Sequence, residues 1–263
     1  MQETPYSEEI RFDGEKSCTD EELCDMIRFA QSLGLKVALK PTVNCDNGVW
    51  RARISFFDHD VPCEPKWGNW FESHIAFQKH YAQIAQRTGC ELFLTGCEMT
   101  MTEHRETEWR KLIAEVRTVY DGPVGYNCDK YGEDHITWWE AVDVIASSGY
   151  YPIDDWENQL DRIEEVVKKY QKPFLFSEAG CMNIHGSAQV PNNWELRGEE
   201  DDAEQADWYL AMFSACEKRD WVKGFGIWDW PGSMERKSPY AVCDRPAEAV
   251  IAEEYSCRGK NRR

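Results

Sequence analysis

Short apolar runs recur along this chain, and each run ends in polar or aromatic residues. Segments with helical spacing of apolar residues lie between them. The runs end near residues 41, 98, 127, 151, 178 and 229, and most are about 25 to 30 residues apart, as in alternating β and α units. No glycine-rich phosphate loop follows any run, so the pattern favours a (β/α)8 barrel of the TIM type over a doubly wound nucleotide-binding sheet.

Six strand–helix units are recognisable rather than the eight of a complete barrel. We expect them to form one domain over residues 1–263. A capping box at Thr19 and Glu22 predicts the first helix, which ends at Gly34. A strand over residues 35–39 and a long loop over residues 42–70 are expected to follow, because loops of this length are usually functional.

The composition limits the classes of partner. The net charge of −18 would repel phosphate backbones and anionic lipids, so we expect no nucleic-acid or membrane partner. The chain contains 13% aromatic residues, including twelve tryptophans, which is typical of a globular protein. No run of eighteen apolar residues predicts a membrane span.

The number and spacing of the cysteines indicate the redox state of the cellular compartment. Eleven is an odd number, and their scattered positions form no Cys-x-x-Cys pair. We therefore expect mostly reduced thiols and a cytoplasmic protein, and no signal peptide is recognisable at the N-terminus. The six histidines show no metal-binding spacing, so neither a metal nor another cofactor is expected.

Two carboxylates follow similar apolar runs. Glu98 comes after Leu92–Leu94 and Thr95-Gly96, and Glu178 comes after an apolar run that begins at Pro173. Either one alone is more simply interpreted as a solvated loop residue. As a pair they suit glycoside hydrolysis, in which one carboxyl group protonates the leaving oxygen and the other attacks the anomeric carbon or activates water.

Several of these stretches, in this order, resemble Glycoside Hydrolase Family 113. They are Gly34–Pro41, Leu94–Met99, Tyr150-Tyr151-Pro152, Lys172–Gly180 and Trp228-Asp229-Trp230. The resemblance implies a retaining endo-β-1,4-mannanase of the TIM-barrel clan that acts on mannan or mannooligosaccharides. Glu98 would then be the acid/base on strand four, and Glu178 would be the nucleophile on strand seven.

The resemblance also implies substrate contacts. Trp228 matches the sugar-stacking position on the last strand, with Trp230 beside it, and Tyr151 lies where an aromatic residue approaches the nucleophile. The simpler interpretations are a core tryptophan for Trp228 and a packed turn tyrosine for Tyr151. Asn127 is either a sugar ligand or a turn cap, and Lys40 is either a ligand or half of a salt bridge.

Other tryptophans are expected on loops, where they are candidates for the walls of sugar subsites: Trp50, Trp67, Trp70, Trp156 and Trp194. Aromatic faces suit the apolar faces of pyranose rings. Tryptophans within helical runs are expected to pack instead: Trp109, Trp138, Trp139 and Trp208.

Two departures from the family pattern leave alternatives open. Cys97 stands where much of the clan has an asparagine that contacts the substrate. Strands one and two have no counterpart here, so the recognisable strands are three to eight. The expected outcomes are an open or incomplete barrel, a homodimer that covers the exposed strand edges, or a truncated gene product. The alternative functions are a related xylanase or β-glucosidase, and a catalytically inactive carbohydrate-binding remnant.

Overall fold

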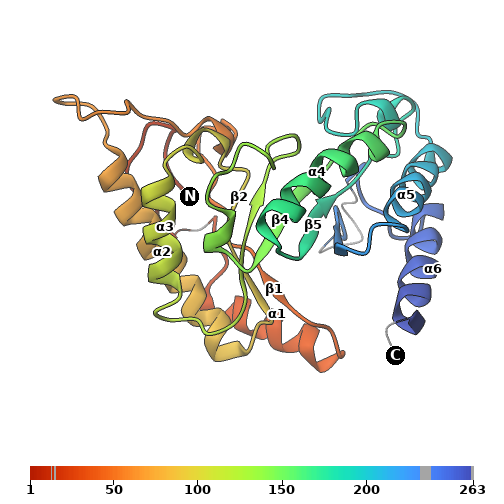
Figure 1. The fold of residues 1–263 in the computed structure, drawn as a ribbon, viewed down its shortest axis with the longest axis horizontal. Helices are drawn as coiled ribbons and strands as arrows, with labels where there is room; N and C mark the ends of the chain where they lie inside the picture. Colours follow the sequence, from red (N-terminus) through yellow and green to blue (C-terminus); the bar gives the residue numbers. More distant parts are fainter. Residues whose placement is uncertain (13, 15, 232–237, 262–263) are drawn as a thin grey trace. The chain divides into compact units, whose positions relative to one another are not determined.

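The computed structural model describes residues 1–12, 14, 16–231 and 238–261. Within them the chain alternates strands with helices (Figure 1). The strands are β1 (Ala38–Leu39), β2 (Leu92–Cys97), β3 (Val124–Cys128), β4 (Val144–Gly149), β5 (Phe174–Ala179) and β6 (Val222–Ile227). The α-helices are α1 (Asp20–Ser32), α2 (Trp67–Thr88), α3 (Glu106–Val116), α4 (Trp156–Tyr170), α5 (Asp202–Cys216) and α6 (Pro246–Asn261).

The strands lie in the sheet in chain order, from β1 to β6. The pairs β1–β2, β2–β3 and β5–β6 are parallel. Parallel neighbours need long crossover connections, and here helices supply them. This arrangement confirms the predicted (β/α) barrel type, with six strands among the described residues.

Local sequence signals explain where several elements begin and end. The capping box is present, because the Glu22 amide donates to Thr19 Oγ1 and the Thr19 amide donates to Glu22 Oε2. Helix α2 ends at Gly89, whose φ of 73° is left-handed and favours glycine. Four short 3₁₀ turns lie in the described connections: η1 (Arg51–Arg53), η2 (Thr100–Thr102), η3 (Trp139–Ala141) and η4 (Ser187–Gln189).

Two boundaries differ from the predicted ones. Strand β1 has only two residues, because the Val37 amide donates to the Glu91 side chain and Leu35 is exposed. Helix α2 begins at Trp67, so the predicted loop over residues 42–70 ends earlier. Trp67 and Trp70 are buried in this helix and pack edge-on at 6.1 Å between ring centroids. The loop position expected for these two tryptophans was therefore wrong.

The chain divides into two compact units, residues 1–146 and 147–263. The first has an aromatic core in which Trp109 and Trp138 stack at 5.1 Å. In the second, Trp156 lies edge-on to Phe176 and Trp208. The expectation of one domain over residues 1–263 stays a prediction.

Two further observations concern the chain as a whole. None of the eleven cysteines, all of which lie among the described residues, forms a disulfide bond. Among the described residues, no helix has both the length and the apolar character that a membrane span requires.

Candidate active site

Glu98 directly follows β2, a strand whose residues from Phe93 onward are buried. The Glu98 side chain is also buried, with 7% of the residue exposed. Its amide donates to the Asn127 carbonyl at 2.8 Å, which ties it to the end of β3. The φ of Glu98 is 51°, in the left-handed region that non-glycine residues seldom adopt. Such a conformation persists only where surrounding contacts enforce it, and these positions cluster at functional sites.

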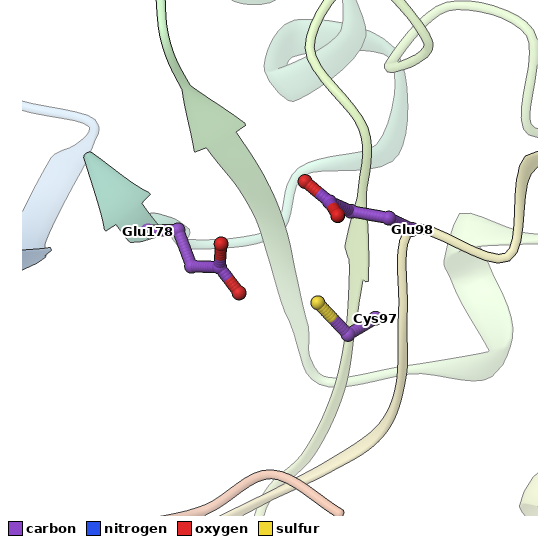
Figure 2. A group of neighbouring side chains, drawn as sticks. All are labelled: Cys97, Glu98 and Glu178. Atoms are coloured by element: carbon purple, nitrogen blue, oxygen red, sulfur yellow. The ribbon is translucent and has the colours of Figure 1, made fainter. Parts of the chain in front are cut away.

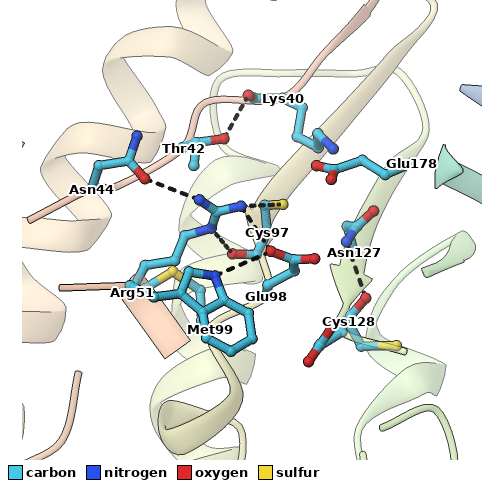
Figure 3. Close-up of polar contacts among 12 residues, drawn as sticks. Lys40, Thr42, Asn44, Arg51, Cys97, Glu98, Met99, Asn127, Cys128 and Glu178 are labelled. Carbon is cyan, nitrogen blue, oxygen red and sulfur yellow. Dashed lines mark hydrogen bonds and ion pairs between the residues drawn. The ribbon is translucent and has the colours of Figure 1, made fainter. Parts of the chain in front are cut away.

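Two residues of the connection between β1 and α2 hold the Glu98 carboxylate, and Figure 3 shows one of them, Arg51, beside it. Arg51 Nη2 lies 2.9 Å from Glu98 Oε2, and Trp50 Nε1 donates to the same oxygen at 3.3 Å. Arg51 and Glu98 are largely buried, with side-chain exposures of 15% and 9%. A charge-assisted pair in such surroundings is stronger than a surface pair and favours the ionised carboxylate.

The guanidinium of Arg51 also bonds to Cys97 and Asn44. Arg51 Nε donates to the Cys97 carbonyl at 2.8 Å, and Nη1 donates to Asn44 Oδ1 at 2.9 Å. Arg51 Nη2 also lies 3.3 Å from the Cys97 sulfur. Cys97 therefore contacts the guanidinium that positions its neighbour. Sequence reasoning missed Arg51, because nothing in the loop pattern separates it from Arg53 two residues later.

Two buried side chains, Tyr126 and Glu103, hold the segment after Glu98 through hydrogen bonds. The Met99 amide donates to the Tyr126 hydroxyl at 3.0 Å, and that hydroxyl donates to Glu103 Oε1 at 2.7 Å. Burial raises the pKa of Glu103 to about 8 and places the pKa of Tyr126 well above its ordinary value. The peptide that carries Glu98 is thus held by hydrogen bonds on both sides.

Glu178 lies near the end of β5 and is 6% exposed. The Tyr150 hydroxyl donates to Glu178 Oε2 at 3.1 Å. Figure 2 shows Glu178 close to the tip of β5, and Cys97 and Glu98 as successive residues at the end of β2. Tyr150 follows β4 directly, and it is this residue that contacts the carboxylate.

The tyrosine assigned from the resemblance, Tyr151, has a different environment. It is fully buried and packs edge-on against Trp156 and Phe176. The simpler interpretation of Tyr151 as a packed turn residue fits these contacts. Because adjacent tyrosines point in different directions, the pattern Tyr-Tyr-Pro did not distinguish Tyr150 from its neighbour.

Several aromatic rings of the second unit lie around Tyr150. Trp194 lies 4.3 Å from Tyr240 and 6.2 Å from both Tyr150 and Trp228, measured between ring centroids. Trp194 is 50% exposed and Trp228 is 38% exposed. Gly180 permits this packing, because a Cβ there would lie 2.2 Å from the Trp228 carbonyl oxygen. The structure thus brings together Trp194 and Trp228, two of the predicted sugar-binding residues.

The remaining predicted ligands have mixed environments. Trp230 is 62% exposed, and Lys40 directly follows β1. Asn127 is buried in β3, where its Nδ2 donates to the Cys128 carbonyl at 3.0 Å. The loop position expected for Trp156 was wrong: it begins α4 and is 2% exposed, so its ring is packed in the core and presents no face to a sugar. The binding roles of the other residues stay predictions.

A histidine and two acids join the connection after β5 to helix α5. His185 Nδ1 is 3.1 Å from Asp201 Oδ2 and 3.4 Å from Glu204 Oε2. The hydrogen bond to Asp201 raises the pKa of His185. The Glu204 carboxylate already accepts from the Gly186 and Ala188 amides, and Asp201 caps α5. These contacts are those of an ion pair that anchors the loop to the helix.

Comparison with known proteins places this geometry in a family. The profile described as Glycoside Hydrolase Family 113 matches residues 1–245. Two solved structures of a GH113 β-1,4-mannanase share 55% and 54% identity with this chain, at TM-scores of 0.94 and 0.93. The GH113 β-mannanase AaManA from Alicyclobacillus acidocaldarius, in complex with ManMIm, shares 41% identity at a TM-score of 0.92. Each comparison covers 97% of this chain and 84% of the other. The comparison with curated proteins found no match. The fold, the position of Glu98 and Glu178 at strand ends, and these likenesses agree, and the chain belongs to Glycoside Hydrolase Family 113.

Proposed function

We propose that this protein is a retaining endo-β-1,4-mannanase in which Glu98 is the acid/base and Glu178 is the nucleophile. The observation that carries the proposal is the 55% identity, over 97% of the chain, to a GH113 β-1,4-mannanase. The two glutamates add chemical support. Each lies at or next to the end of a strand, is less than a tenth exposed and accepts hydrogen bonds from fixed donors.

In the first step, an oxygen of Glu178 forms a bond to the anomeric carbon while the bond to the leaving sugar breaks. The proton of Glu98 moves to the departing oxygen, so the leaving sugar departs as an alcohol. Retention requires the two carboxyl groups to be about 5 to 5.5 Å apart during the reaction. Tyr150, which donates to Glu178, would orient the nucleophile and hold its unused oxygen.

In the second step, Glu98 acts as a base. Its carboxylate takes a proton from water, the water oxygen bonds to the anomeric carbon, and Glu178 departs as a carboxylate. Arg51 favours the ionised form of Glu98 that this step needs. Arg51 therefore assists the second step and opposes the first, which needs protonated Glu98.

The first test compares Glu98→Gln and Glu178→Gln with the wild type. Glu178→Gln is expected to lose activity by a factor of about 10³ or more on every substrate, because the attacking group is gone. Glu98→Gln is expected to lose most activity on mannooligosaccharides but to form the glycosyl-enzyme from an aryl β-mannoside, whose leaving group needs no proton. Burst kinetics with the aryl substrate measure this difference.

Two results would contradict the assignment. Equal, background-level rates for the wild type and Glu178→Gln would favour an inactive carbohydrate-binding remnant. Equal losses of the aryl burst in Glu98→Gln and Glu178→Gln would remove the distinction between acid and nucleophile.

Substrate choice is tested separately with defined oligomers of β-1,4-linked mannose, xylose and glucose. Release from the mannose series alone is expected. Activity on xylose or glucose oligomers without activity on the mannose series would favour the related xylanase or β-glucosidase.

We also propose a cytoplasmic location and a homodimer. The location is supported by the eleven cysteines, which form no disulfide bond and which a reducing compartment would keep as thiols. It is tested by fractionating the source cells. The dimer is supported by exposed apolar residues on one face of α1, namely Met26 and Phe29, and by Leu33 and Leu35 just beyond the helix.

A further inference from the structure

A cavity of about 680 Å³ lies in the first unit, close to the segment that carries Glu98. Its size falls within the range of small-molecule sites in proteins. Three segments that are distant in the sequence line it: the N-terminal stretch, the connection between β1 and α2, and η2. The lining residues are Tyr6, Arg53, Ser55, Phe56, Phe57, Glu64, Pro65 and Met101.

The N-terminal wall of this cavity is fixed on both sides of Tyr6. On one side the Gln2 amide donates to the Asn44 carbonyl at 2.9 Å, and the Asp46 amide donates to the Gln2 carbonyl at 2.8 Å. On the other side Glu8 Oε1 accepts from the Lys66 amide. Tyr6 therefore extends from a backbone held at two points, and its ring can meet a ligand at low entropic cost.

The chemistry of the lining suits a neutral sugar. Tyr6 is 66% exposed, Phe57 is 56% exposed and Met101 is 43% exposed. Exposed aromatic rings offer apolar faces to pyranose C–H groups. Arg53, Glu64 and the Ser55 hydroxyl add donors and acceptors for sugar hydroxyls. Opposite charges on Arg53 and Glu64 favour neither an anionic nor a cationic ligand.

The cavity shares two short turns with the segment that carries Glu98. Turn η1 contains both Arg51, which is paired with Glu98, and Arg53, which lines the cavity. Turn η2 contains Met101, three residues after Glu98. Trp50, which donates to Glu98, precedes η1 and is 43% exposed.

We propose that this cavity is a remote subsite that binds a mannosyl unit beyond those at the cleaved bond. The inference rests on the proposed mannanase function. The subsite would contribute only when the substrate is long enough to reach it, so it would set the preference of the enzyme for chain length. Tyr6 and Phe57 would hold the sugar by its faces, and Arg53 and Glu64 would bond its hydroxyls.

The test uses Tyr6→Ala, Phe57→Ala and the double variant on two substrates, mannohexaose and an aryl β-mannobioside. Each single change is expected to lower kcat/KM for mannohexaose by about 2- to 10-fold, the range of aromatic contacts. The values for the aryl substrate should stay those of the wild type, because it is too short to reach the cavity. Tyr6→Phe keeps the ring face and should restore most of the lost activity.

Leu210→Ala is the control, since Leu210 is 51% exposed on α5 and is not among the residues that line the cavity. It should change neither substrate. Equal losses on both substrates, or no loss on either, would overturn the subsite.

A binding measurement keeps the subsite testable independently of catalysis. Calorimetry with mannohexaose and the Glu178→Gln variant should show weaker binding when Tyr6→Ala and Phe57→Ala are added. An unchanged Kd would overturn the subsite even if the enzyme proves to be a mannanase. A wild type that binds mannohexaose through Tyr6 and Phe57 but does not cleave it would overturn only the proposed function.

Discussion

At the scale of single residues, the arginine beside the proposed acid/base is expected to control more than the position of that carboxyl group. Arg51 lies 2.9 Å from Glu98 and contacts both the carbonyl and the sulfur of Cys97. A guanidinium at this distance stabilises the charged form of a carboxyl group. In the proposed mechanism this charge opposes the protonated form of Glu98 that the first step needs.

Arg51→Gln is expected to move the basic limb of kcat/KM for mannooligosaccharides to higher pH. Removing the positive charge favours protonated Glu98, so the acid persists as the pH rises. The maximal rate should fall as well, because Glu98 and Cys97 lose their anchor. Rates measured from pH 4 to pH 9 test this.

Arg87→Gln is the control, because Arg87 makes its contacts with Cys24 and Asp20. Its pH profile should match that of the wild type. A basic limb that stays in place in Arg51→Gln while the rate falls would show that Arg51 acts only by packing.

At the scale of elements, the connection after β2 depends on a buried acid. Glu103 accepts from Tyr126, which in turn holds the Met99 amide. Burial raises the pKa of Glu103 to about 8, and the charges of Asp129, Glu133 and Glu98 add to this rise. The unfolded chain would release this proton near the ordinary value of 4.5. The folded protein therefore holds a proton that the unfolded chain has lost between these pH values.

This difference fixes the sign of a stability effect. Because the folded state binds more protons, the contribution of Glu103 to stability falls as the pH rises from about 5 to 8. Glu103→Gln cannot titrate but still accepts from Tyr126. The Tm of Glu103→Gln minus that of the wild type is therefore expected to increase over this range, as measured by calorimetry in matched buffers.

Glu106→Gln serves as the comparison. Hydrogen bonds from Thr137 and Arg110 lower the pKa of Glu106 below its ordinary value, so this residue does not titrate between pH 5 and 8. Its Tm difference from the wild type should be constant there. A constant difference for Glu103→Gln as well would mean that Glu103 is ionised at pH 5.

At the scale of the whole molecule, one helix face lacks a covering element among the described residues. Met26 and Phe29 on α1 are 65% and 61% exposed, and Leu33 and Leu35 just beyond the helix are 63% and 58% exposed. The spacing of Met26 and Phe29 puts both on one face of the helix. Contiguous exposed apolar surface of this kind often marks an interface between proteins.

The double variant Phe29→Glu/Leu33→Glu is expected to convert the proposed dimer to monomer. Charged residues on both partners would face each other across the interface. Light scattering after size-exclusion chromatography measures the mass. Leu210→Glu, on an exposed position of α5, should leave the mass unchanged. A wild type that is monomeric at all micromolar concentrations would reject the dimer.

The sequence was sufficient for the strand–helix alternation and for the position of both glutamates at strand ends, because strand ends in this fold carry a local signature of apolar residues followed by polar ones. The sequence did not predict the contacts that Arg51, Tyr150 and Glu103 make at the candidate site. Their roles depend on which side chains meet in space, and a neighbouring residue of the same type, such as Arg53 or Tyr151, carries the same local signal. Trp156 and Trp67 were misplaced because the first turn of a helix, like a loop, tolerates irregular polar neighbours.

The left-handed backbone of Glu98 also has an evolutionary consequence. A φ of 51° disfavours glutamate and favours glycine or asparagine, so under the proposed role selection for hydrolysis retains a residue that folding alone would replace. A lineage released from selection for hydrolysis is expected to acquire glycine or asparagine at this position and to gain thermal stability as it does so. The residue found there in a newly sequenced relative would then distinguish a working enzyme from a descendant that has kept only the fold.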